Sequence, residues 1–232
     1  MLVISLENIV EAAVADRSRQ NIGGYIKDID KLFCKDNLRM LEESHKGIFA
    51  FLAFHPKSDS AIIKYLQKGS LGFDSGNTIL VMFALGEAAN TPQPINEESF
   101  KTWLIVDQQS CSSYEIVRRL FEKSPPPLPG IVFIDKLSEL TEPVFVSFEG
   151  KETADEVKSF ARKVFHIAEQ SYNEYLEEQD GEFAAKFCVR LAQKEIEYYR
   201  ALEKSILEWI IYAFNLVKKN SESLVSIVKI FV

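Results

Sequence analysis

Cysteine is scarce in this sequence, and its spacing excludes several kinds of site. The 232 residues include only Cys34, Cys111 and Cys188, which lie far apart. No CxxC pair and no cluster of cysteine with histidine is present, so we expect neither a zinc site nor a disulfide framework. Free thiols fit a reducing compartment, and the sequence therefore predicts a cytoplasmic protein without a metal or other cofactor. We expect Cys34 and Cys188 to pack as small apolar side chains and Cys111 to be an inert thiol.

Basic residues are fewer than acidic ones, which limits the classes of binding partner that the chain can have. The chain has 27 Lys and Arg residues against 34 Asp and Glu residues, a net charge of -7. Nucleic-acid-binding proteins usually carry a basic face, so we expect no nucleic-acid partner. The acidic balance gives no reason for attraction to an anionic membrane. Residues 1–14 include acidic residues and no basic n-region, so we expect no signal peptide.

No apolar run is long enough to span a membrane. The longest apolar concentration, residues 206–217, reads ILEWIIYAFNLV and is interrupted by a glutamate and an asparagine. A spanning helix needs about 20 residues. Here Trp209, Ile210 and Phe214 are distributed around the expected helix, and a helix that is apolar all round is buried on several sides. We therefore expect these three residues to form an interface with another protein or with a second copy of the chain.

Helical spacing of apolar residues dominates the beginning of the chain. It predicts helices over residues 5–19, 25–33 and 36–45, the first of them capped by Ser5. Residues 1–46 are therefore predicted to form an N-terminal helical segment.

The end of the chain also shows helical spacing, over much longer stretches. Helices are predicted over residues 152–179 and 182–219, with a break at Asp180 and Gly181. Two long helices joined by so short a break indicate an antiparallel helical hairpin. Residues 171–232 are therefore predicted to form a C-terminal helical extension.

The central part of the chain alternates strands and helices. The expected strands are residues 47–54, 78–85, 102–106, 131–135 and 143–148, and the expected helices are residues 55–69 and 112–123. The strand candidates are continuous apolar runs, which is typical of strands buried on both faces. The last two lie close enough in sequence to form an antiparallel hairpin. Residues 86–99 form a long polar loop.

The order of these elements between residues 47 and 170 resembles the thioredoxin fold. Leu128-Pro129 before IVFI is similar to the cis-proline loop ahead of the family's third core strand. IVD at 105–107, followed by a helix, is similar to the family's central strand and the helix after it. The hairpin ending at Gly150, with EVKSFARKVF next, is similar to the closing hairpin and final helix. The resemblance implies an α/β domain over residues 47–170, with a mixed sheet flanked by helices.

The redox motif of that family is missing. The family places CxxC between a buried strand and a helix N-terminus, where the helix dipole lowers a thiol pKa. This sequence has FHPKS at 54–58, with His55 and Ser58 in the two cysteine positions. If the strand at 78–85 is the equivalent one instead, the loop GEAANTPQP that follows it also lacks cysteine. We therefore expect no dithiol oxidoreductase activity, and we expect Pro129 to face His55 and Ser58.

The residues of this segment have two possible roles, and we predict no catalytic residue among them. His55 is either a ligand or general base at a helix N-terminus or a surface or capping residue. We favour the surface or capping role because no second histidine is near in sequence. Ser58 or Asp59 is the expected N-cap of the helix. A small anion, including a glutathione-like one, can bind the N–H groups of a helix that starts near Ser58, with help from Lys57.

Together these patterns predict an adaptor or structural subunit in preference to an enzyme. Its redox-inactive thioredoxin-like core would bind a partner protein, or a second copy as an oligomer, through the C-terminal helices. One alternative is a glutathione-transferase-like enzyme or small-anion binder, since those enzymes also join a thioredoxin-like domain to helices. A second alternative is a membrane-active effector that uses the apolar run at 206–217.

Overall fold

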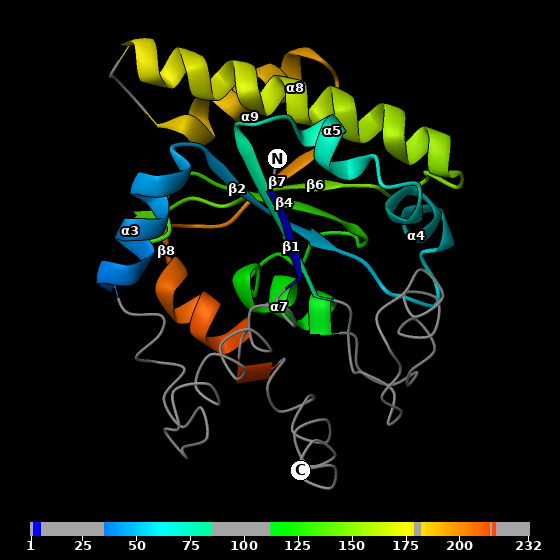
Figure 1. Cartoon of the computed structure of the whole chain (residues 1–232), viewed down its shortest axis with the longest axis horizontal. Coiled ribbons are helices and arrows are strands. Elements are labelled where there is room, and N and C mark those ends of the chain that lie inside the picture. The colour runs from blue at the N-terminus through cyan, green and yellow to red at the C-terminus, as the bar shows by residue number, and fades with distance from the viewer. Residues whose placement is uncertain (1, 6–34, 85–111, 179–181, 214, 217–232) are drawn as a thin grey trace, which may run out of the picture.

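The chain folds around a six-stranded mixed sheet with helices on both faces (Figure 1). The computed structural model describes residues 2–5, 35–84, 112–178, 182–213, 215 and 216. The strands of the sheet are β1 (Leu2–Ser5), β2 (Ile48–Ala53), β3 (Ile79–Phe83), β4 (Gly130–Ile134), β6 (Val144–Ser147) and β7 (Tyr198–Arg200). Their order across the sheet is β1-β3-β2-β4-β6-β7. The predicted α/β class is thereby confirmed.

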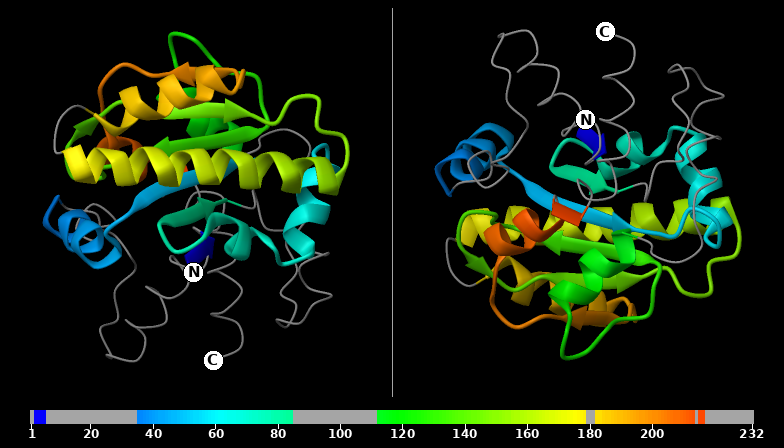
Figure 2. Two further views of the ribbon diagram at one scale, coloured as in Figure 1. Left: turned by 90° about the horizontal axis from the view of Figure 1, so that it is seen from above. Right: turned by 90° about the horizontal axis from the view of Figure 1, so that it is seen from below.

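Two layers of helices enclose this sheet (Figures 1 and 2). The helices are α3 (Lys35–His45), α4 (Ser60–Gln67), α5 (Leu71–Ser75), α7 (Ser112–Leu120), α8 (Ala154–Glu178) and α9 (Phe183–Gln193), and residues 206–213 are also helical. Helices α4, α5, α8 and α9 pack against one face, and α3, α7 and the 206–213 helix contribute to the core on the other. Two short strands, β5 (Leu140–Thr141) and β8 (Lys204–Ser205), pair separately.

The central strand β2 shows why the sequence reads as an unbroken apolar run. All six of its residues are buried. Because side chains alternate along a strand, half of them enter each layer. Ile48, Ala50 and Leu52 join the core under α8 and α9. Phe49, Phe51 and Ala53 join the core under α7 and the 206–213 helix.

The strand pairing confirms the predicted hairpin and adds a parallel unit. Strand β2 runs parallel to β3 and antiparallel to β4, and β4 runs antiparallel to β6. The connection between β2 and β3 carries α4, as predicted, and also α5, where the sequence indicated only a turn. At the end of the β2–β4 pair, Ala53 lies opposite Gly130. This register brings the proline-rich segment before β4 next to the residues that follow β2.

The proline-rich segment enters β4 through a cis peptide bond between Leu128 and Pro129, at the place that the resemblance compares with a cis-proline loop. Two hydrogen bonds from the end of β6 hold it. The hydroxyl of Ser147 donates to the Pro127 carbonyl at 2.9 Å, and the Phe148 N–H donates to the Pro129 carbonyl at 2.8 Å. The segment that leads into β4 is therefore hydrogen-bonded to the end of β6, the other strand of the hairpin.

The beginning of the chain differs from the predicted helical segment. Residues 2–5 form β1, which pairs in parallel with the outer edge of β3, from Leu2 with Leu80 to Ser5 with Phe83. Ser5, expected as a helix cap, is therefore a strand residue. The pairing requires the edge of β3, which lies about eighty positions later in the chain. Helix α3 confirms the prediction for residues 36–45, whereas the helices predicted over 5–19 and 25–33, the strand over 102–106 and the loop over 86–99 lie outside the described residues.

The predicted helix over residues 182–219 is interrupted, so the long C-terminal hairpin is wrong. Helix α9 ends at Gln193, and Glu195 adopts a positive φ of 56° that no α-helix contains. The next residues form β7, which pairs with the free edge of β6. There Tyr199 packs edge-on against Phe145, with ring centroids 6.3 Å apart. Aromatic residues fit a strand well when an edge offers hydrogen bonds and a ring to pack against.

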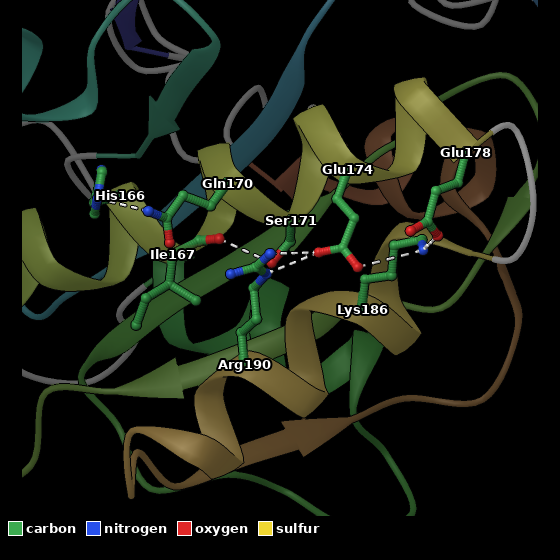
Figure 3. Close-up of polar contacts among 8 residues, drawn as sticks. All are labelled: His166, Ile167, Gln170, Ser171, Glu174, Glu178, Lys186 and Arg190. Atoms are coloured by element: carbon green, nitrogen blue, oxygen red, sulfur yellow. Dashed lines mark hydrogen bonds and ion pairs between the residues drawn. The ribbon is translucent and has the colours of Figure 1, made fainter.

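The remaining helical pair is α8 with α9, and ion pairs join the two helices (Figure 3). Glu174 of α8 accepts hydrogen bonds from Nε and Nη2 of Arg190 at 3.0 and 2.5 Å, and Lys186 lies 3.6 Å from it. Arg190 holds the pKa of the Glu174 carboxyl below its usual range. Lys186 also pairs with Glu178. Helix α8 runs unbroken across residue 170, where the sequence analysis placed a domain boundary.

Candidate functional site

The turn over residues 54–59 is the candidate site, because it follows β2 at the carboxyl end of two parallel strands. Ligands of α/β sheets gather at such ends, where backbone groups and helix N-termini meet. Helix α4 starts directly after the turn, at Ser60. Helix α7 adjoins the end of β3, where the hydroxyl of Ser113 donates to the Ala84 carbonyl at 2.6 Å. The register of β2 with β4 places the segment containing Pro129 beside the same turn.

His55 closes this turn with its ring. The backbone N–H groups of Lys57 and Ser58 both donate to His55 Nδ1, at 3.1 and 3.2 Å. An acceptor nitrogen carries no proton, so these two hydrogen bonds require the tautomer with its proton on Nε2. The ring of His55 therefore closes the turn before α4, whereas the N-cap position of α4 itself belongs to Asp59.

The side chain of Asp59 joins the turn to helix α7 through hydrogen bonds. Its Oδ2 accepts the backbone N–H of His55 at 2.5 Å and the phenol of Tyr114, which comes from α7. The residue occupies the N-cap position of α4, but its side chain makes no hydrogen bond to the helix N–H groups. Ser58 is not the N-cap, and its hydroxyl lies 3.4 Å from Asp59 Oδ1.

Tyr114 belongs to the site, although the sequence analysis did not include it. Its ring lies 6.0 Å from the His55 ring, centroid to centroid. It stands 55 positions after Asp59 in the chain. No local pattern identifies such a partner, because it is brought to the turn by the packing of α7 on the sheet. The only signal in the sequence was a tyrosine in the first turn of an amphipathic helix.

The arrangement offers little to an anion. A carboxylate, that of Asp59, already occupies the start of α4, where the helix dipole favours negative charge. Two backbone N–H groups that face the turn are already used by His55. Lys57 is exposed and is the one cationic side chain of the segment. The turn is therefore a closed structural unit whose polar groups satisfy one another.

Trp209 and Ile210, expected at an interface, are buried in the chain's own core. Their exposed fractions are 5% and 6%. The indole N–H of Trp209 donates to the Ile116 carbonyl at 2.7 Å, and its ring packs edge-on against Phe51 at 5.5 Å. The apolar helix over 206–213 thus covers the sheet face beside α7, and that is why it is apolar on several sides. Phe214 lies outside the described residues.

One pocket lies away from the turn, where β5 and β8 meet the ends of α8 and α9. Its volume is about 100 Å³, and it is lined by Asp135, Lys136, Leu140, Thr141, Glu142, Tyr175, Glu182, Ala184 and Glu203. Several of its charges are already paired, Lys136 with Glu139 and Glu142 with Arg200. None of the residues proposed from the sequence lines it. In the part of the chain that the structure describes, no group of histidine, cysteine and carboxylate side chains can hold a metal ion, and no helix is long and apolar enough to cross a membrane.

Cys188 is expected to resist alkylation in the folded chain. The residue is buried in α9, and burial raises the pKa of its thiol to about 12. Since the thiolate is the reactive form, iodoacetamide at about pH 8 leaves Cys188 unmodified until denaturant unfolds the protein. Peptide mapping by mass spectrometry measures the modified fraction before and after unfolding. Full modification of Cys188 in the folded chain would contradict its burial.

Compared with protein-family models, with curated proteins and with solved structures, the chain gives no match. The interpretation of the site therefore rests on its own geometry.

Proposed function

We propose that this chain is a non-catalytic adaptor or structural subunit of the cytoplasm, with a redox-inactive thioredoxin-like core that binds another protein or a second copy of itself. The strand order supports the thioredoxin-like part. A parallel βαβ unit, β2 to β3, is followed by the antiparallel hairpin of β4 and β6, and the sheet order is β3-β2-β4-β6. Pro129 directly precedes β4, where the resemblance expects a proline.

The closed turn over residues 54–59 carries the non-catalytic part of the proposal. Nucleophilic and redox chemistry both require a reactive side chain with an acceptor or donor left for substrate. Here Nδ1 of His55, the acceptor nitrogen of its ring, receives two backbone amides. Oδ2 of the Asp59 carboxylate accepts a backbone amide and the Tyr114 phenol. The Ser58 hydroxyl is 3.4 Å from Asp59 Oδ1, and the acceptor nitrogen of His55 receives backbone N–H groups instead of this hydroxyl.

The helical part of the chain offers apolar side chains to a partner. Leu176 on α8, Val189 on α9 and Leu202 before β8 are exposed to 51%, 57% and 63%. These residues replace Trp209 and Ile210 as the contact residues of the proposal. Solvent-exposed leucine and valine side chains contribute to association when a partner removes them from water.

Charge placed on these side chains tests the proposal. The wild-type chain and the variants Leu176→Glu, Val189→Glu and Leu202→Glu are compared by light scattering and by affinity capture from the native host. We expect at least one variant to lose the oligomer or the captured partner, because a buried unpaired carboxylate is costly at an interface. Asn173→Glu, at an exposed polar position of α8, is the matched control and should retain it.

Two outcomes contradict the proposal. The first is a wild-type chain that is monomeric and captures no protein. The second is an assembly that all three charged variants keep, since the helical part would then not be the contact surface. The glutathione-transferase-like alternative is checked on the same samples by retention on glutathione resin, and the Asp59 carboxylate at the start of α4 leads us to expect no retention. The membrane-active alternative predicts liposome leakage, which the adaptor does not.

A further inference from the structure

The ring of His55 is the acceptor of two hydrogen bonds that a single proton would abolish. Both Lys57 N–H and Ser58 N–H point at Nδ1. In the imidazolium form both ring nitrogens carry a proton and neither can accept. Protonation would therefore place an N–H donor at Nδ1 facing the backbone N–H groups of Lys57 and Ser58, and the ring would offer them no acceptor.

We propose that His55 is a pH-sensitive latch on the turn over residues 54–59. The neutral ring closes the turn, and the imidazolium opens it. This inference concerns the turn alone and does not depend on the proposed function.

The groups around His55 provide the open state with an alternative partner. On its own segment lie the Asp59 carboxylate, which already binds the His55 backbone N–H, and the exposed Lys57. From α7 comes Tyr114, whose phenol donates to the same carboxylate and whose ring lies 6.0 Å from the His55 ring. The register of β2 with β4 brings residues 125–129 next to the residues after β2, and these prolines and leucine have no titratable side chain. An imidazolium is therefore attracted to the Asp59 carboxylate, where it competes with the Tyr114 phenol. The exposed Lys57 ammonium repels it more weakly.

The change is confined to the turn, because the flanking elements have hydrogen bonds of their own. Strand β2 is paired on both sides, with β3 and β4. The start of α4 is held by backbone bonds from Asp59 N–H to the His55 carbonyl, at 3.0 Å, and from Ile63 N–H to the Asp59 carbonyl, at 3.1 Å. Neither bond uses the imidazole. Opening therefore frees the amides of Lys57 and Ser58 without unfolding the sheet or the helix.

Nuclear magnetic resonance on the full chain tests the latch. Ring nitrogen shifts of His55 and the amide shifts and exchange rates of Lys57 and Ser58 are followed from about pH 8 to about pH 5, the range of histidine titration. We expect the ring to carry its proton on Nε2 at the upper end. The two amides should titrate with the midpoint of the His55 ring and exchange roughly tenfold faster, after correction for intrinsic rates, once their acceptor is lost.

A substitution that keeps an acceptor but cannot titrate separates the latch from other causes. In His55→Asn the side-chain carbonyl can accept the same amides, as asparagine does in turns, and the amide of Lys57 should stay protected at every pH. His166→Asn, at an exposed position of α8, is the control and should leave the transition unchanged. The latch is overturned if the amides ignore the His55 ring, if the neutral ring is protonated on Nδ1, or if His55→Asn still opens in acid.

Discussion

Replacement of Trp209 by alanine is expected to lower the free energy of unfolding by about 3–5 kcal/mol, the range for removing a buried aromatic side chain. The loss has two sources. The indole packs against Phe51 of the central strand, so its removal leaves a cavity between the sheet and the 206–213 helix. The Ile116 carbonyl also loses the indole N–H, a buried hydrogen bond that it accepts in addition to its place in helix α7. Chemical denaturation followed by circular dichroism measures the change.

Two further variants separate the two sources of the lost unfolding free energy. Trp209→Phe retains a ring but no N–H, and should cost about 0.5–1.5 kcal/mol from the lost hydrogen bond to the Ile116 carbonyl. Leu202→Ala, at an exposed position, should remain within about 0.5 kcal/mol of the wild type. A Trp209→Ala variant with unchanged stability and lost association would restore the interface that the sequence alone predicted.

Replacement of Gly130 by alanine is expected to destabilise the fold by about 3 kcal/mol or more, at the upper end of the range for overpacked cores. A Cβ atom at this position would lie 2.1 Å from Cζ of Phe145 and 2.5 Å from the carbonyl oxygen of Val146. The Phe145 ring cannot withdraw easily, because it packs between Phe121 and Tyr199. The carbonyl belongs to the paired strand β6, so β4 and β6 would have to separate. Urea denaturation gives the magnitude.

Gly69→Ala is the matched control for this substitution. Gly69 has a φ of +67°, but no atom lies within 4 Å of an added Cβ. Only the left-handed backbone opposes alanine there, which costs about 1 kcal/mol. If Gly130→Ala were no worse than Gly69→Ala, the close contact between β4 and β6 would not exist in solution.

Much of the central fold was predictable because it depends on residues that are neighbours in the chain. The apolar runs that became β2, β3, β4 and β6 are strands that helices cover on both faces. The short gap between β4 and β6 indicated their hairpin, and the proline before Gly130 indicated how β4 begins. The composition of the 54–58 segment was enough to predict that no dithiol lies there.

The candidate site was predictable only in part. The ring of His55 closes the turn before α4, whose N-cap position is Asp59. The sequence placed His55 at a turn before a helix, in a surface or capping role. It assigned the N-cap to Ser58 or Asp59 without the phenol that holds Asp59. Tyr114 reaches that carboxylate from α7, and α7 is positioned by the sheet rather than by the turn. A side chain 55 positions away leaves no trace in the local pattern.

The sequence by itself determined which segments are buried strands, where α8 begins and ends to within about two residues, and which redox chemistry the turn lacks. Only the tertiary structure decided that residues 198–200 are a strand and that Trp209 is a core residue. The reason is the same in both cases. Helical spacing of apolar residues indicates that a surface is buried, but not what buries it. For residues 198–200 the partner is the free edge of β6, and for Trp209 it is a carbonyl 93 positions earlier in the chain.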